Sequence, residues 1–197
     1  MGYIDWVGLQ PAFIALVGAL VGGGCAIYGV YVTHENNLKE HEIKEENEVR
    51  NFLKAIHSEI LTIWERYSNT YKVEVDGIRD GQWLNYIYPI KQDYFTVYNN
   101  NTHLLGKIQN NDLRKRIVVA YTQAKGLIDS LVSNNESLEE YNMASWEYQR
   151  EQSSISEAHM YALKHVLLNY APKIKEQSIE LEKNIRDLIK DIDGHTS

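Results

Sequence analysis

Residues Leu9 to Val32 form one uninterrupted apolar stretch, LQPAFIALVGALVGGGCAIYGVYV, which contains no charged side chain. About 20 such residues, at about 1.5 Å of rise each, cross a hydrocarbon core about 30 Å thick. The stretch therefore predicts one transmembrane helix, and we assign residues 1–33 to a membrane anchor. A chain that begins this way must place its remaining residues on one side of a bilayer.

Small residues recur along the apolar stretch at alternating spacings of three and four. Because positions three and four apart share a helix face, these residues predict a narrow seam where another helix can approach closely. The partner helix would belong to a second copy or to another protein. Small residues are also common in membrane helices, so lipid contact alone is the alternative. The seam consists of Ala15, Gly18, Gly22, Cys25 and Gly29.

The residues flanking the stretch predict its orientation. No Lys or Arg precedes it, whereas Lys39, Lys44 and Arg50 follow it. Basic residues near a span favour the cytoplasmic side, so we expect the N-terminus outside and the rest of the chain in the cytoplasm. Aromatic residues at both edges fit the positions of interfacial belts; they are Tyr3, Trp6, Tyr28 and Tyr31.

Two alternatives compete with a membrane span. A cleaved signal peptide or lipoprotein leader begins with basic residues, but the only charge among the first six residues is that of Asp5. A core helix of a water-soluble protein would have to be covered on every side.

The remaining residues predict an all-α protein. Residues 34–48 are nearly all polar and form a charged stalk, which is either helical or a looser linker. Residues 49–197 show apolar residues at three- and four-residue spacing, which predicts a cytoplasmic bundle of four to five helices. We expect helices from Val49 to Tyr67, through Leu104 to Ile108, from Asn110 to Val132, from Ser137 to Tyr170 and from Lys173 to Asp193.

The composition excludes several classes of function. A net charge of −7 argues against direct nucleic-acid binding, which depends on basic residues. A single cysteine, Cys25, excludes an intrachain disulfide and a zinc site built on cysteines. The chain has no nucleophile elbow, phosphate-binding loop or HExxH motif. We therefore expect no enzymatic activity, cofactor or metal. His34 and His41, seven residues apart, are read as part of the stalk rather than as a pH sensor.

The most distinctive segment of the domain begins at Asp93 with DYFTVYNNNTHLLGKI, continues with LRKRIVVAYTQAKGLIDS and ends at Asn134 and Asn135. Residues 83–135 resemble uncharacterised bacterial single-span membrane proteins that accompany prophages or anti-phage systems. The resemblance implies a location in the bacterial inner membrane and a role in phage defence. From the residues themselves we expect a helical hairpin. In this hairpin the expected packing places Tyr94, Phe95, Tyr98, Leu105 and Ile108 on Ile117, Tyr121 and Ile128. The alternative is a partner surface made of aromatic and basic side chains, namely Trp83, Tyr94, Phe95, Tyr98, Arg114, Lys115 and Arg116.

Two functional hypotheses follow. The first is a non-enzymatic effector of anti-phage defence (abortive infection), whose membrane helix clusters through the seam and perturbs the bilayer once a controlling partner releases it. The second is a membrane-anchored adaptor that recruits or scaffolds a cytoplasmic protein or ribonucleoprotein without toxicity. In both hypotheses the partners include the lipid bilayer and a second helix in the membrane.

Overall fold

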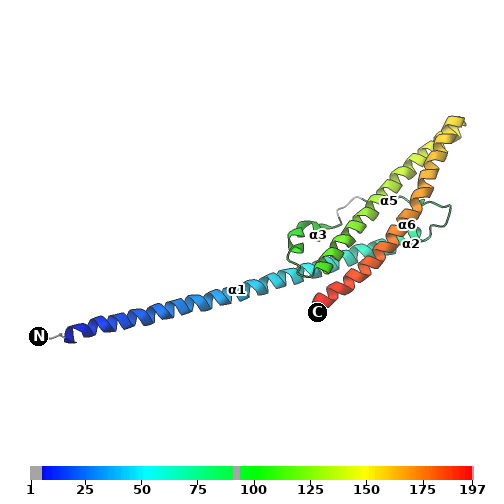
Figure 1. The fold of residues 1–197 in the computed structure, drawn as a ribbon. Helices are drawn as coiled ribbons and strands as arrows, with labels where there is room; N and C mark the ends of the chain where they lie inside the picture. Colours follow the sequence, from blue (N-terminus) through cyan, green and yellow to red (C-terminus); the bar gives the residue numbers. More distant parts are fainter. Residues whose placement is uncertain (1–5, 91–93, 197) are drawn as a thin grey trace. The chain divides into compact units, whose positions relative to one another are not determined.

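The protein is all-helical in the computed structural model, which confirms the predicted fold class. The structure describes the backbone of residues 6–90 and 94–196, and the side chains of residues 15, 22–25, 28–90 and 94–196. No strand occurs within these ranges. The chain divides into two compact units, Met1–Glu48 and Val49–Ser197 (Figure 1).

The first unit consists of the beginning of helix α1, which spans Trp6–Thr70. All residues from Tyr28 to Glu48 are exposed. Two ion pairs between neighbouring turns support the polar part, from Lys39 to Glu35 at 2.7 Å and from Lys44 to Glu40 at 2.9 Å. Such pairs add about 0.2–0.5 kcal/mol each to an exposed helix. The charged stalk is thus a regular helix rather than a looser linker.

Among the described residues, no helix combines the length and apolarity needed to cross a membrane. Most side chains of the stretch from Leu9 to Val32 lie outside the described residues. The membrane anchor therefore stays a prediction from the sequence.

The core of the second unit forms where α1 packs against two long helices, α5 (Asn111–Glu151) and α6 (Ser154–Thr196). Three short helices, α2 (Lys72–Asp76), α3 (Thr96–Asn100) and α4 (Thr102–Leu105), complete it. Each fully buried Leu or Ile contributes about 1.5–3 kcal/mol relative to an exposed one. The largest of these core side chains come from all three long helices, namely Ile56, Ile60, Leu113, Ile117, Ile174, Leu188 and Ile192.

Helix α5 extends beyond the predicted end near Ser133–Asn135, so that boundary was wrong. Asn134 is buried and donates from its Nδ2 to the carbonyl of Leu84 at 3.2 Å. The amide of Asn135 bonds both backbone groups of Tyr88, accepting from its N–H at 2.9 Å and donating to its carbonyl at 2.7 Å. The two asparagines therefore hold Leu84 and Tyr88, which lie in the segment that precedes α3, against helix α5. Their usual preference for turns and caps is outweighed by these tertiary bonds.

The turn that joins α5 to α6 lies at Gln152 and Ser153, inside the segment that was predicted to be one helix. Gln152 adopts a left-handed conformation with φ of 48°, and its N–H donates to the carbonyl of Tyr148 at 2.8 Å. Ser153 then caps α6, because its Oγ accepts from the N–H of Ser156 at 3.1 Å. Helix α6 continues without a break through Pro172, although the sequence predicts that one helix ends at Tyr170 and another begins at Lys173. The three helices predicted between Asn110 and Asp193 are therefore two, and α5 and α6 form a single long antiparallel hairpin (Figure 1).

The left-handed residue at the turn predicts the effect of a glycine there. Gln152→Gly should raise the free energy of unfolding by about 0.5–1 kcal/mol, because a side chain at positive φ is strained and glycine is not. The control Gln149→Gly, at an exposed position in the last turn of α5, should lower it by up to about 1 kcal/mol. Urea unfolding followed by circular dichroism measures both values, and equal effects of the two substitutions would contradict the assigned turn.

Candidate functional site

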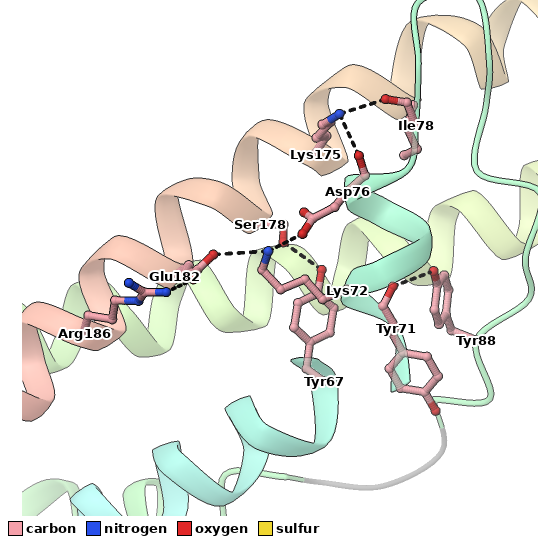
Figure 2. Close-up of polar contacts among 10 residues, drawn as sticks. All are labelled: Tyr67, Tyr71, Lys72, Asp76, Ile78, Tyr88, Lys175, Ser178, Glu182 and Arg186. Carbon is pink, nitrogen blue, oxygen red and sulfur yellow. Dashed lines mark hydrogen bonds and ion pairs between the residues drawn. The ribbon is translucent and has the colours of Figure 1, made fainter. Parts of the chain in front are cut away.

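The densest cluster of charged side chains joins α2 to α6. Figure 2 shows Lys72 lying between Asp76 and Glu182, with its Nζ bonded to Asp76 and 3.2 Å from Oε2 of Glu182. Glu182 also accepts a bond from Arg186 one turn further along α6. Burial alone would lower the pKa of Lys72, but its bonds to the two carboxylates outweigh burial and raise that pKa above its ordinary value. A lysine held in the ammonium form serves as an ion-pair partner rather than as a base.

Lys175 and Ser178 of α6 complete this cluster. The ammonium of Lys175 donates to the carbonyls of Asp76 at 2.9 Å and of Ile78 at 2.8 Å, at the end of α2. Ser178, which is fully buried, accepts from the hydroxyl of Tyr67 at 2.9 Å (Figure 2). A cation at a helix C-terminus is favourable because the last carbonyls lack partners within the helix. The cluster therefore fixes α2 on α6.

A second polar centre forms around the carboxylate of Glu59 on α1. It accepts from the backbone N–H groups of Val97 at 2.6 Å and Tyr98 at 3.2 Å, and from the hydroxyl of Tyr121 at 2.7 Å. Burial, together with this bond and the nearby carboxylate charge, raises the pKa of Tyr121. Glu59 thus joins α1, α3 and α5. The sequence did not single out Glu59, because its donors lie about 40 and 60 residues away and leave no local pattern.

The named side chains of both polar centres bond to other groups of the chain. These bonds account for the positions of the side chains. In the part of the chain that the structure describes, no three His, Cys, Asp or Glu side chains are placed to hold a metal ion.

The aromatic residues named for a partner surface differ in burial, since Phe95 is buried whereas Trp83, Tyr94 and Tyr98 are half-buried. Phe95 is buried, and the ring of Tyr98 stacks on Tyr121 with centroids 4.0 Å apart. The expected packing of Phe95 and Tyr98 on Tyr121 is therefore confirmed. Phe95 is too deeply buried to belong to the alternative partner surface. Trp83 is half-buried against Tyr141 of α5, with centroids 5.6 Å apart. Tyr94 is also half-buried and lies under the guanidinium of Arg66.

The basic cluster at the start of α5 is partly engaged within the chain. Arg114 donates to the side chain of Asn111 at 2.6 Å, and Arg116 pairs with Asp191 at 2.7 Å. Lys115 is exposed. The three side chains therefore do not form one free basic patch.

The predicted seam is open to its surroundings where its side chains are described. Ala15 and Cys25 are exposed, and a Cβ added at Gly22 or Gly29 would meet nothing within 4 Å. The surroundings of Gly18 lie outside the described residues, as do the side chains of Tyr3 and Trp6. Tyr28 and Tyr31 are exposed.

A candidate site that the sequence did not indicate lies at the free end of the α5–α6 hairpin, residues 142–163, which we call the hairpin end. Four of its large apolar side chains are exposed, namely Met143 at 66%, Trp146 at 73%, Ile155 at 82% and Tyr161. Tyr148, Met160 and Leu163 are half-buried. Its buried side chains are small, namely Ala144 and Ser156. Within the second unit, Figure 1 shows this end lying apart from α2, α3 and the part of α1 that follows Glu48.

Other parts of the chain pack against the hairpin before its free end. Along residues 113–131, α5 packs against the apolar face of α1. Further along, Trp83 contacts Tyr141, and the ammonium of Lys164 lies 5.7 Å from the centre of the Trp83 ring. Single exposed apolar residues are normal, but a group of large ones beside a small-residue interior is typical of an interaction surface.

Comparison of the chain with protein-family models, curated proteins and solved structures found no match. The resemblance of residues 83–135 to prophage-associated membrane proteins thus stays a prediction.

The role of Glu59 is tested by Glu59→Gln. The amide nitrogen cannot accept the N–H and hydroxyl bonds that the carboxylate accepts, so at least one buried donor loses its partner. We expect the free energy of unfolding to fall by about 1–3 kcal/mol, measured by urea unfolding of the full chain. The control Glu65→Gln, at an exposed position of the same helix, should change it by less than about 0.5 kcal/mol. A similar loss in both variants would contradict the assigned role.

Proposed function

We propose that this chain is a membrane-anchored, non-enzymatic adaptor, whose helical unit recruits or scaffolds a partner protein through the hairpin end. The observation that carries the proposal is the reversed arrangement of that segment, in which Trp146 and Met143 are exposed while Ala144 is buried. Burying a large apolar side chain stabilises a protein by about 1.5–3 kcal/mol relative to leaving it exposed. A partner that covers Trp146 and Met143 would supply this stabilisation. Trp and Met are enriched in interface cores for this reason.

The membrane anchor in this proposal rests on the sequence. The stretch from Leu9 to Val32 is long enough to span, and the basic residues that follow it favour the orientation with the helical unit in the cytoplasm. The resemblance of residues 83–135 supports a bacterial inner membrane. A protein or ribonucleoprotein partner is compatible with the net charge of −7, whereas direct binding to nucleic acid is disfavoured.

Removing residues 1–32 tests the anchor. The full chain should remain in the membrane fraction after washing at alkaline pH, and the shortened chain should move to the soluble fraction. Gly18→Leu with Gly22→Leu lengthens two side chains of the seam and keeps the stretch apolar, so this variant should stay in the membrane and change at most its self-association. Release of the full chain by the wash would refute the anchor.

The defence effector is the second candidate function, and one observation favours it. The seam is open at Gly22, Gly29 and Cys25, so a second membrane helix could approach closely there. In this function the seams of several chains cluster and perturb the bilayer after a controlling partner is released.

Expression in bacteria separates the effector from the adaptor. An effector should slow growth as the full chain, by at least about tenfold in surviving colonies, and lose this toxicity without residues 1–32 or with Gly18→Leu and Gly22→Leu together. An adaptor should be harmless in every form. Equal toxicity of the full and shortened chains would count against the effector, because its action requires the membrane helix.

A further inference from the structure

The hairpin end carries a pattern that specifies the chemistry of its partner. Residues at spacings of three, four and seven share one face of a helix. On α5 these spacings bring Glu139, Glu140, Met143, Trp146 and Glu147 onto one outward face, and all five are exposed. Two large apolar side chains thus lie between carboxylates.

The charge of this face is strongly one-sided. The nearest base on it is Arg150, which is paired with Glu151 at 3.0 Å. On α6, the ammonium of Lys164 lies over the rings of Trp83 and Tyr161 rather than beside these carboxylates. Glu139, Glu140 and Glu147 consequently have no cation bonded to them among the described residues, and they favour a basic partner.

The shape of the segment favours a helical partner. Met143, Trp146 and Arg150 line a shallow hollow together with Asn142 and Glu147. The segment consists of two packed helices, so it offers helix faces, and the described residues contain no strand edge that an extended peptide could join. Nearer the other end of the hairpin, the amphipathic face of α1 packs against α5 and α6 as the third helix. A third helix from outside would do the same at residues 142–163, in the usual manner of helix bundles.

A second copy of this chain is a poor occupant of the same face. A symmetric contact would bring the acidic patch of one copy, formed by Glu139, Glu140 and Glu147, against the same patch of the other, and like charges in an interface are repulsive. An anionic lipid surface is disfavoured for the same reason.

We propose that the face formed by Met143 and Trp146, flanked by Glu139, Glu140 and Glu147, is the docking site for a basic amphipathic helix of a partner protein. The partner's apolar side chains pack on Met143 and Trp146, and its Lys or Arg side chains pair with the three carboxylates. This inference rests on the proposed adaptor function and names the class of partner.

A synthetic peptide serves as the probe. It contains about 18 residues, roughly 27 Å of helix, with leucine at helical spacing and lysine elsewhere. A second peptide replaces every lysine with glutamate. Fluorescence anisotropy of the labelled peptides measures binding to the full chain in nanodiscs of neutral phosphatidylcholine, with empty nanodiscs as background. We expect the lysine peptide to bind at least about tenfold more tightly than the glutamate peptide, and to weaken as salt is raised.

Matched variants assign the binding to this face. Met143→Ala with Trp146→Ala should weaken binding of the lysine peptide about tenfold. The control Ile179→Ala, which shortens an exposed apolar side chain on α6 away from this face, should leave binding unchanged. Glu139→Lys with Glu147→Lys should weaken binding about tenfold. The control Glu176→Lys, at an exposed position of α6 outside this face, should weaken it at most about twofold. Circular dichroism of each variant checks that the helices are retained.

Equal binding of the two peptides would overturn the inference, and so would binding that is unchanged by the Met143 and Trp146 substitutions. Self-association of the chain that these substitutions abolish would assign the face to a second copy. Binding to anionic vesicles that they abolish would assign it to lipid. Membrane fractionation of the same variants separates this inference from the anchor, because all of them should remain in the membrane whether or not the peptide binds.

Discussion

The antiparallel packing of α5 on α6 is the contact on which the second unit depends. Both helices exceed 40 residues, since α5 spans Asn111–Glu151 and α6 spans Ser154–Thr196. Their facing surfaces supply most of the buried Leu and Ile side chains, and the other elements pack against them. The end of α1 covers one part of the pair, Lys72 and Lys175 fasten α2 to α6, and Asn134 and Asn135 hold the segment before α3 on α5.

This dependence explains why the hairpin end differs from the rest of the hairpin. A two-helix contact buries little surface unless a third element covers it, and most helical stability in proteins comes from such packing. Where α1 supplies the third helix, the interior contains Ile56, Ile60 and Ile117. At the hairpin end the buried side chains are those of Ala144 and Ser156, and Met143, Trp146 and Ile155 lie on the outside. The same physical requirement that places α1 on the hairpin thus favours a partner helix at residues 142–163.

The polar centres show how interactions distant in sequence replace local signals. Glu59 collects donors from α3 and α5, and Asn135 bonds both backbone groups of Tyr88. Each is an ordinary surface residue by local pattern. The predicted helix end at Ser133–Asn135 was wrong. An asparagine side chain disfavours a helix when it bonds to the backbone near it, but here the side-chain amides of Asn134 and Asn135 bond to Leu84 and Tyr88 instead. The aromatic segment was predicted as either core or interface, and the packing of Phe95 and Tyr98 on Tyr121 assigns these two side chains to the core.

The sequence by itself determined the all-helical class, since apolar residues at three- and four-residue spacing specify which face of a helix is buried. It also supplies the prediction of a membrane anchor, because apolar length is a local property that needs no tertiary contact. Only the tertiary structure decided that α5 and α6 each run unbroken past Asn134 and Pro172, and that the turn falls at Gln152. It alone identified the hairpin end as a candidate site. Met143 and Trp146 read locally as helix residues like any others, and their exposure depends on which face α6 covers and where α1 ends.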